Sequence, residues 1–293
     1  MLNASPSQAF RGQSRPSLTV GAPKELIRMP LADKRVLVTG SGRGIGLAAA
    51  VALLEAGAAV MLNAERPLGD LPDVGRAMAT FPRARYRQAD VTDDAAADAL
   101  VGAAWAEFGG VDVLVNNVGT FREPAFLDLT RADFDAIFGL NVWAAVRVTQ
   151  AVVRRAVAAG RGGRVLFTTS LNATRSEPGH TLYDASKGAV SALTRQLAVE
   201  LAPVGFTTAA VAPGLVETPL TDFGLRSDPA ARQQVTDQIP LRRIATVEDI
   251  AGWFAFLASD AAAYATGTIV TVDGGLDAQQ MPARPVTRAE RGP

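Results

Sequence analysis

Short apolar runs alternate with longer segments of helical periodicity along most of the chain. Buried strands are expected at residues 35–39, 58–63, 85–88, 111–115, 164–169, 206–211 and 268–272. Helices are expected between them, at 47–56, 93–108, 131–159, 183–201 and 247–257. Strands that alternate with helices from end to end predict an α/β fold, a doubly wound parallel sheet of about seven strands with helices on both faces.

Both ends of the chain lack this periodicity. The first 32 residues are rich in Ser, Pro, Gly and Arg, and their first acidic residue is Glu25. A basic, acid-poor start is typical of a transit peptide, but no amphipathic helix pattern and no secretory apolar core accompany it. We therefore predict disordered tails at 1–32 and 278–293, and one catalytic domain at 33–277.

Composition excludes several classes of protein. The chain has 29 basic and 29 acidic residues, which gives no argument for a nucleic-acid or membrane-surface partner. It has no cysteine and only one histidine, His180, so we expect no disulfide and no metal site. The longest apolar run, residues 47–62, is too short and too interrupted to span a bilayer. We expect no membrane partner and a cytoplasmic location.

Glycine and polar residues follow the carboxyl ends of four predicted strands. A Gly-x-x-x-Gly-x-Gly turn, residues 40–46, separates the first strand from a helix, which is the context of a dinucleotide-binding turn. Asn117 follows the fourth strand, Ser170 the fifth, and Pro213 the sixth. Doubly wound sheets bind ligands at this edge, so these residues predict one ligand cleft.

Tyr183 and Lys187 stand four residues apart at the start of a predicted helix, so they share one face. A nearby ammonium lowers the pKa of a phenol, and such a phenol can exchange a proton with an alcohol or a carbonyl oxygen. The spacing alone is weak evidence, because it also occurs by chance in ordinary amphipathic helices. Asn141 lies in mid-helix between apolar neighbours. This position favours a buried functional role over a solvent-facing one.

The end of the second strand bears on cofactor choice. An acid there suits a free ribose 2′-hydroxyl, whereas a base suits a 2′-phosphate. The sequence places Ala64, Glu65 and Arg66 at this point, and Arg43 lies in the glycine turn. Asp90, after the third strand, either binds the adenine or closes a turn.

Together, Thr39-Gly-x-x-x-Gly-x-Gly46, Asn116-Asn117-x-Gly119, Asn141, Ser170, Tyr183-x-x-x-Lys187 and Pro213-Gly214 resemble the short-chain dehydrogenase/reductase family. The resemblance covers residues 34–276 and implies a single Rossmann-like domain, NAD(H) or NADP(H), and a homo-oligomer, a tetramer or dimer. One departure is Val118, where the family usually has Ala.

The resemblance also implies roles. Ser170 would hold and polarise the substrate oxygen, and Tyr183 would be the general acid/base. Lys187 would lower the pKa of Tyr183 and bind the nicotinamide ribose, and Asn141 would position a water that relays protons. The implied cofactor-binding residues are Gly40, Arg43, Ile45, Gly46, Asp90, Val91, Asn117, Gly119, Tyr183, Lys187, Pro213, Gly214, Val216 and Thr218.

No acid occupies position 64, while Arg66 follows shortly after it and Arg43 lies in the glycine turn, so we expect NADP(H) to be favoured over NAD(H). Glu65 leaves NAD(H) open. The predicted activity is hydride transfer between nicotinamide and a small-molecule carbonyl or secondary alcohol. Two alternatives are a non-catalytic nicotinamide-sensing module on the same fold and an oligomeric scaffold.

The substrate itself is not predicted. Residues 215–243 should form the lid of the pocket, in which Leu220, Phe223 and Leu225 suggest an apolar wall. Asn172, Glu177 and His180 are candidates for polar contacts with the substrate, and His180 is equally compatible with a surface loop residue.

Overall fold

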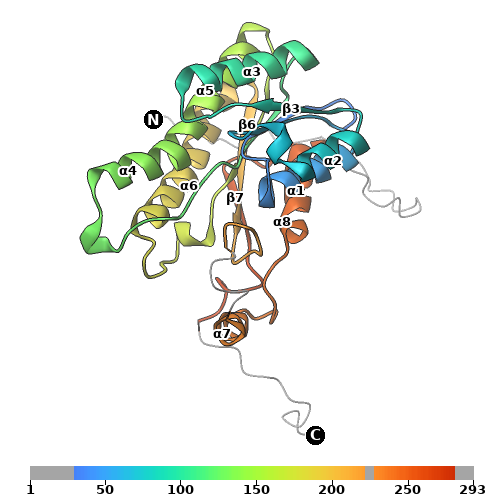
Figure 1. The fold of residues 1–293 in the computed structure, drawn as a ribbon. Helices are drawn as coiled ribbons and strands as arrows, with labels where there is room; N and C mark the ends of the chain where they lie inside the picture. Colours follow the sequence, from blue (N-terminus) through green and yellow to red (C-terminus); the bar gives the residue numbers. More distant parts are fainter. Residues whose placement is uncertain (1–29, 222–227, 281–293) are drawn as a thin grey trace, which may run out of the picture.

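The computed structural model describes residues 30–221 and 228–280, and Figure 1 shows their arrangement. Most of the two predicted tails, residues 1–29 and 281–293, lies outside the described residues, as do the predicted lid residues Phe223 and Leu225.

A single parallel sheet forms the centre of the molecule. Its strands are β1 (Arg35–Val38), β2 (Ala59–Ala64), β3 (Ala84–Gln88), β4 (Val113–Asn116), β5 (Gly163–Thr168), β6 (Phe206–Pro213) and β7 (Thr268–Val272). They pair in the order β3-β2-β1-β4-β5-β6-β7. All seven predicted strands are present within one or two residues of their expected ends, and the doubly wound class is confirmed.

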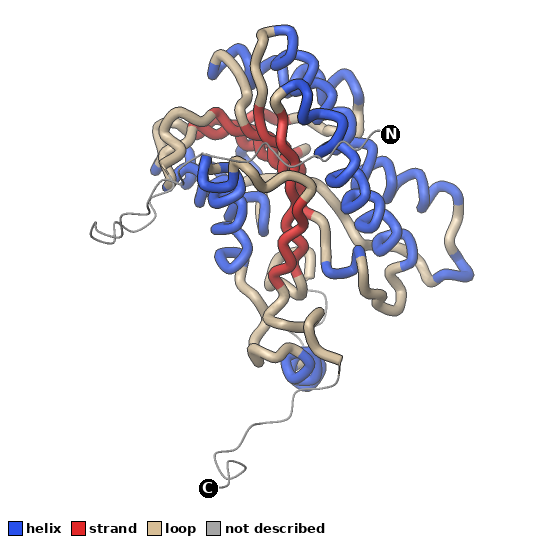
Figure 2. The backbone as a smooth tube through the Cα atoms, turned by 180° about the vertical axis from the view of Figure 1, so that it is seen from behind, coloured by secondary structure: helices blue, strands red, loops and turns tan. Residues whose placement is uncertain are grey.

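Helices cover both faces of the sheet, as Figure 2 shows from behind. The described helices are α1 (Gly44–Glu55), α2 (Pro72–Thr80), α3 (Asp94–Phe108), α4 (Arg131–Phe138), α5 (Ala144–Ala158), α6 (Thr181–Leu201), α7 (Pro229–Gln238) and α8 (Val247–Ala258). One face packs against α1, α2 and α8, and the other against α3, α5 and α6. Helix α7 projects away from these layers (Figure 1).

The strands are apolar on both sides because both sides are covered. In β1, Val36 and Val38 point into the core beneath α1 and α8, whereas Leu37 between them points into the core beneath α3 and α5. All three side chains are completely buried. A parallel strand between two helical layers therefore appears in the sequence as a continuous apolar run rather than as an alternation.

Three of the expected helices begin at residues whose side chains cap them. The Asp93 carboxylate accepts from the backbone N–H of Ala96 at 2.7 Å at the start of α3. Thr130 and Thr246 each form a capping box, with an Asp three residues later, at the starts of α4 and α8. Such caps satisfy N–H groups that have no partner within the helix, and this determines where each helix begins.

Helix α2 was not predicted. The segment contains prolines at 67, 72 and 82, and Pro72 occupies the first turn of the helix, where its missing N–H is no disadvantage. Val74 and Ala77 of α2 are buried, while the other face is exposed. The prolines therefore bracket this helix instead of preventing it.

The long helix expected at 131–159 is present, but one π-helical turn, Gly139–Trp143, separates α4 from α5. Asn141 lies in this turn and is buried. The segment Arg131–Ala158 is long and apolar enough by composition to cross a bilayer. Its apolar side packs against α3 and α6 within the domain, which accounts for that composition.

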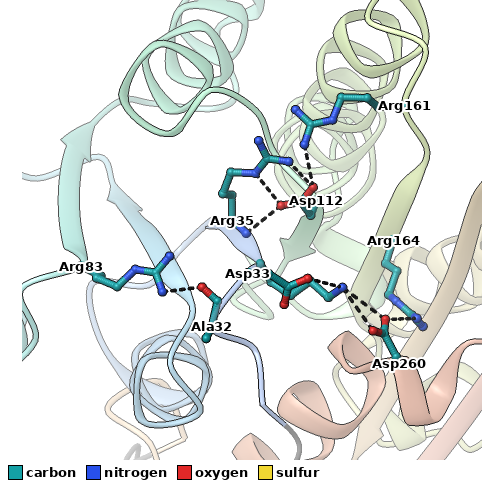
Figure 3. A network of polar contacts seen from close by, with 9 residues as sticks. Ala32, Asp33, Arg35, Arg83, Asp112, Arg161, Arg164 and Asp260 are labelled. Carbon is teal, nitrogen blue, oxygen red and sulfur yellow. Dashed lines mark hydrogen bonds and ion pairs between the residues drawn. The ribbon is translucent and has the colours of Figure 1, made fainter.

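A network of charged side chains lies at the edge of the sheet formed by the amino ends of the strands, near the starts of β1, β4 and β5 (Figure 3). The Arg35 guanidinium donates to both oxygens of Asp112, at 2.6 and 2.5 Å, and Arg161 donates to the same carboxylate at 3.2 Å. Lys34 and Arg164 share Asp260. These pairs link the amino ends of neighbouring strands, so the two edges of the sheet differ in chemistry.

Helix α2 gives a test of the fold. Gly75 lies inside it, and a Cβ built there meets nothing within 4 Å. Gly75→Ala should raise the free energy of unfolding by about 0.5–1 kcal/mol, because alanine has the higher helix propensity. In contrast, a Cβ at Gly162 would lie 2.1 Å from the Gly205 carbonyl oxygen, so Gly162→Ala should destabilise the protein. Urea denaturation measures both, and destabilisation by Gly75→Ala would contradict α2.

Candidate active site

A cavity of about 1090 Å³ opens at the carboxyl ends of the strands, where the sequence predicted one ligand cleft. The predicted site residues that line it are Gly40, Arg43, Ile45, Arg66, Asp90, Val91, Asn117, Gly119, Ser170, Tyr183, Lys187, Pro213, Gly214, Val216 and Thr218. Gly46 and Asn141 do not line it. Gly46 lies close against Gly40 and Asn117, and Asn141 accepts a hydrogen bond from the backbone of Thr120, which does line the cavity.

The glycine turn between β1 and α1 is shaped by close contacts. A Cβ at Gly46 would lie 2.3 Å from both the Gly40 carbonyl oxygen and the Asn117 side-chain nitrogen. Gly40 itself has φ +61°, and a Cβ there would lie 2.8 Å from a methyl group of Val118. The valine that departs from the family pattern thus packs against a glycine, without displacing the turn.

Asn117 joins three strand ends. Its side chain donates to the Gly40 carbonyl oxygen at 3.0 Å and accepts from the Thr168 hydroxyl at 3.0 Å. Its backbone N–H donates to the Thr39 hydroxyl at 3.1 Å. Asn117 therefore links the ends of β1, β4 and β5 at the wall of the cavity.

Asn141 is held completely within the protein. Its side-chain oxygen accepts from the backbone N–H of Thr120 at 2.8 Å. Its side-chain nitrogen donates to the Thr120 carbonyl at 2.8 Å and to the Ser186 hydroxyl at 2.9 Å. The π turn brings this side chain between the β4–α4 connection and α6. Asn141 thereby positions the loop that carries Gly119.

Ser170 and Tyr183 meet at the inner end of the cavity. Burial raises the pKa of Tyr183, a hydrogen bond with the Ser170 hydroxyl lowers it, and the Asp184 and Glu177 carboxylates raise it again. The pKa of Tyr183 is therefore above its ordinary value of 10.0. This differs from the expected lowering by Lys187, whose Nζ lies 5.7 Å from the ring centre, because burial is the largest influence on the pKa of Tyr183.

Lys187 is buried on the next turn of α6. Its Nζ donates to the Thr168 carbonyl at 3.0 Å, and a Cβ at Gly119 would lie 3.4 Å from it. Burial lowers the pKa of Lys187 to about 8, because the charged form loses its hydration. The ammonium therefore faces the cavity beside Gly119, with one N–H bound to protein.

The end of β2 presents both signs of charge. Ala64 is buried, and a Cβ at Gly42 would lie 3.0 Å from its methyl group, so position 64 faces the glycine turn. Glu65 and Arg66 follow and line the cavity, as does the exposed Arg43. Arg66 lies 3.7 Å from the carboxylate of Asp70. No carboxylate occupies the position nearest the turn.

Asp90 closes a turn and also lines the cavity. Its carboxylate oxygen accepts from the backbone N–H of Thr92 at 2.9 Å and from the Thr92 hydroxyl at 2.7 Å. One oxygen thus holds the turn after β3, and both roles that the sequence left open are compatible with this geometry.

The segment after β6 forms the remaining wall. The Gly214 N–H donates to the Val272 carbonyl at 3.0 Å, and a Cβ at Gly214 would lie 2.8 Å from that of Asp273. Val216 forms a parallel bridge with Ala245. The hydroxyls of Thr218 and Thr221 lie 3.1 Å apart in a tight turn that follows the bridge.

Several cavity residues were missed. Phe121 contacts the Tyr183 ring edge-on at 6.0 Å and that of His180 at 5.3 Å, and only its position after the Asn-Asn-x-Gly motif could have indicated it. The other missed lining residues include Asn63, Thr120, Leu140, Thr168 and Thr221. Leu220 lines the cavity as expected.

The three polar candidates for substrate contacts have other partners. The Asn172 amide donates to Asp184 at 2.7 Å. Glu177 lies 3.2 Å from His180, whose ring packs against Tyr183 with the centres 5.7 Å apart. None of the three lines the cavity. Asn172 is therefore a structural residue of the connection between Ser170 and α6.

The glycine cradle fits a dinucleotide. Gly44, the first residue of α1, takes φ +58°, a conformation that favours glycine. A side chain at Gly42 or Gly214 would meet neighbouring atoms at 3.0 Å or closer. Free N–H groups at a helix start attract a pyrophosphate, and the absent side chains let it approach the backbone.

Comparison with known proteins agrees with this geometry. The sequence profile of the family described as enoyl-(acyl carrier protein) reductase matches residues 40–277. The L-rhamnose 1-dehydrogenase (NAD(P)(+)) of Azotobacter vinelandii is 38% identical over 85% of this chain and 98% of that enzyme. The L-xylulose reductase of Bos taurus is 36% identical over 84% of this chain and 97% of that enzyme.

A solved structure resembles the whole domain. The gluconate 5-dehydrogenase from Burkholderia cenocepacia, in complex with NADP and tartrate, superposes with a TM-score of 0.79 at 33% identity. The match covers 86% of this chain and 98% of that one. Relatives of this kind are catalysts, which favours the enzymatic interpretation over a nicotinamide-sensing module. The chain therefore belongs to the short-chain dehydrogenase/reductase family, and it is an NAD(P)-dependent oxidoreductase that acts on alcohol or carbonyl groups.

Proposed function

We propose that Ser170, Tyr183 and Lys187 carry out the proton chemistry of this oxidoreductase, and that NADP(H) is its preferred cofactor. The observation that supports the first part is their convergence. Ser170, whose hydroxyl lowers the pKa of Tyr183, lies with Tyr183 and Lys187 at the wall of one cavity, and Lys187 is one helical turn further along α6 than Tyr183. The glycine turn, which fits a dinucleotide, lines the same cavity.

Tyr183 is the proposed general acid/base. In reduction, its phenol gives a proton to the substrate oxygen, and in oxidation the phenolate takes the proton of the alcohol. The hydroxyl of Ser170 donates a hydrogen bond to the same oxygen and so holds it beside Tyr183. The high pKa of Tyr183 makes it a proton donor at neutral pH in this state of the protein.

Lys187 and Asn141 have supporting roles. The Lys187 ammonium, bound on one side to the Thr168 carbonyl, faces Gly119 and can hold ribose hydroxyls and bias Tyr183 toward the phenolate. Asn141 holds the Gly119 loop through Thr120. The water relay from Lys187 to solvent through Asn141 remains a prediction.

When bound, NAD(P)(H) supplies or accepts the hydride. Its pyrophosphate fits the glycine turn, and the proposed contacts elsewhere are Asp90 and Val91 for the adenine and Pro213, Gly214, Val216 and Thr218 for the nicotinamide. The preference for NADP(H) rests on the end of β2. Ala64 faces the turn without a carboxylate, while Arg43 and Arg66 both line the cavity and match a 2′-phosphate.

Substrate, assembly and location are open to direct tests. The names of the relatives make L-rhamnose and L-xylulose the first probes, one for oxidation and one for reduction. The homo-oligomer, a tetramer or dimer, and the cytoplasmic location stay predictions.

Tyr183→Phe should lower turnover by about a hundredfold or more, because the substitution removes the hydroxyl that donates the proton. The aromatic ring is kept. Binding of the reduced cofactor should persist. Absorbance of the reduced nicotinamide follows the reaction with each probe sugar, and cofactor fluorescence follows binding. Tyr264→Phe, the same change at a fully exposed tyrosine, is the control and should have no effect. Near wild-type turnover in Tyr183→Phe would refute the proposed mechanism.

Arg43→Ala and Arg66→Ala should each weaken NADPH binding by roughly tenfold or more and leave NADH binding almost unchanged. Loss of one charge-assisted hydrogen bond to a phosphate accounts for this size. Fluorescence titration measures both cofactors side by side. Arg76→Ala, which removes an exposed arginine paired with Asp73, is the matched control. A wild-type preference for NADH would show instead that Glu65 or the backbone determines the choice.

The buried ammonium of Lys187 makes stability depend on pH. Its pKa is about 8 in the folded protein and 10.5 in the unfolded chain, so the unfolded chain binds the extra proton in this range. Stability should therefore rise as the pH increases from about 8 to 10.5, by about 3 kcal/mol in total from this group. Lys187→Met should lack this rise in denaturant titrations.

Lys34→Met is the matched control for this rise. Burial opposes the charge of Lys34, but Asp33 and Asp260 raise its pKa above 10.5. The stability that the charge of Lys34 contributes is lost only above pH 10.5. Lys34→Met should therefore keep the wild-type rise in stability between about pH 8 and 10.5. A Lys187→Met protein with an unchanged pH profile would contradict the burial of a charge at this position.

A further inference from the structure

The serine loop, residues 171–180, connects Ser170 to α6 and is tied to that helix by one carboxylate. Asp184 stands directly after Tyr183 in the first turn of α6. One of its oxygens accepts from the Asn172 side-chain amide at 2.7 Å, and the other accepts from the backbone N–H of Glu177 at 3.2 Å. The carboxylate thus bridges both halves of the serine loop.

Asn172 carries this connection on to the catalytic serine. Its backbone N–H donates to the Ser170 Oγ at 3.1 Å, while its side chain is held by Asp184. A serine oxygen that accepts this bond keeps its own proton for another partner. Two hydrogen bonds therefore link the Asp184 carboxylate to the orientation of the Ser170 hydroxyl.

An acid in the first turn of a helix is often present only because it stabilises the helix end. The geometry here is different. The hydrogen bonds that the Asp184 carboxylate accepts come from the serine loop. The free N–H of Leu182 in the same first turn is satisfied instead by the carboxylate of Glu123, at 2.8 Å. Asp184 therefore orders the serine loop, and Glu123 caps the helix.

We propose that Asp184 is a positioning residue for the reaction, which acts through Asn172 to hold the Ser170 hydroxyl against Tyr183. This inference rests on the proposed roles of Ser170 and Tyr183. Asp184 thus affects the reaction through the orientation of Ser170, although it does not line the cavity.

The charge of Asp184 has a second consequence. After burial and the Ser170 hydroxyl, its carboxylate is the next influence on the pKa of Tyr183, and it raises that pKa. The titratable groups packed around Tyr183 within the described residues are Asp184 and Lys187 on α6, Glu177 and His180 in the serine loop, and Glu123 after β4. Removal of the Asp184 charge should therefore lower the pKa of Tyr183.

Asp184→Asn keeps the shape of the side chain but has only one accepting oxygen, so one of the two loop contacts is lost. We expect kcat with a probe sugar to fall about tenfold or more, because a small displacement of a catalytic group has effects of this order. The KM for the cofactor should change little. The tyrosinate absorbance of Tyr183, isolated by subtraction of Tyr183→Phe, should appear at lower pH than in Asn172→Ala, which breaks the same link but keeps the charge that raises this pKa.

Two further variants separate the two effects. Asn172→Ala removes the link but keeps the charge, so it should lower kcat. Because the Ser170 hydroxyl lowers the pKa of Tyr183, the tyrosinate absorbance of this variant should appear at higher pH than in the wild-type protein. It also provides the test if Asp184→Asn does not fold. Asp73→Asn removes an acid from the first turn of α2, far from the serine loop, and controls for general loss of helix stability. The losses in Asp184→Asn and Asn172→Ala should be less than additive in the double variant, because both break one chain of contacts.

The outcomes distinguish this inference from the proposed function. Tyr183→Phe could be inactive while Asp184→Asn and Asn172→Ala both retain the wild-type kcat and Asp184→Asn also keeps the wild-type tyrosinate titration. In that case only the positioning role is refuted. If Tyr183→Phe itself retains turnover, the proposed function fails. A lower melting temperature in Asp184→Asn with unchanged kcat would reduce Asp184 to a stabiliser of the helix start.

Discussion

The close contact at the end of β1 is the constraint on which the site depends. Gly46 approaches the Gly40 carbonyl and the Asn117 side chain so closely that no Cβ fits between them. Asn117 also binds Thr39 and Thr168, so the ends of β1, β4 and β5 are joined through one side chain. Because the sheet is parallel, these ends lie on one edge, and the cleft can form there.

The proposed catalytic groups are connected to this edge of the sheet by hydrogen bonds. Thr168 binds Asn117 through its hydroxyl and Lys187 through its carbonyl, so the cofactor wall and the catalytic helix share one residue of β5. Asn141 ties the loop after β4 to Ser186 of α6. The proposed proton donor Tyr183, Lys187 and the glycine turn are therefore parts of one hydrogen-bonded framework rather than separate motifs.

Burial determines the electrostatics of this framework. It raises the pKa of Tyr183 and lowers that of Lys187, so each group is shifted toward its neutral form. The attraction between the two, which the sequence spacing suggested as the main effect, is secondary in this structure. Binding of a charged cofactor or substrate would change the protonation of both groups, as expected of residues that move protons.

The sequence by itself determined the strand and helix order, most boundaries and the cleft residues, because these depend on local patterns. Apolar runs mark the two-sided strands, and Asp93, Thr130 and Thr246 mark the helix starts by chemistry that acts within three residues. The motif residues at the strand ends follow from topology, since parallel strands bring their carboxyl ends together.

Only the tertiary structure decided which polar groups are partners. Asn172 binds Asp184 instead of lining the cavity, and Glu123 caps a helix 59 residues further along the chain. Neither contact has a local signature in the sequence. The π turn at Asn141 and the helix α2 likewise depend on what packs against them. Contacts between residues far apart in the chain are set by packing, and packing appears only when the whole domain has folded.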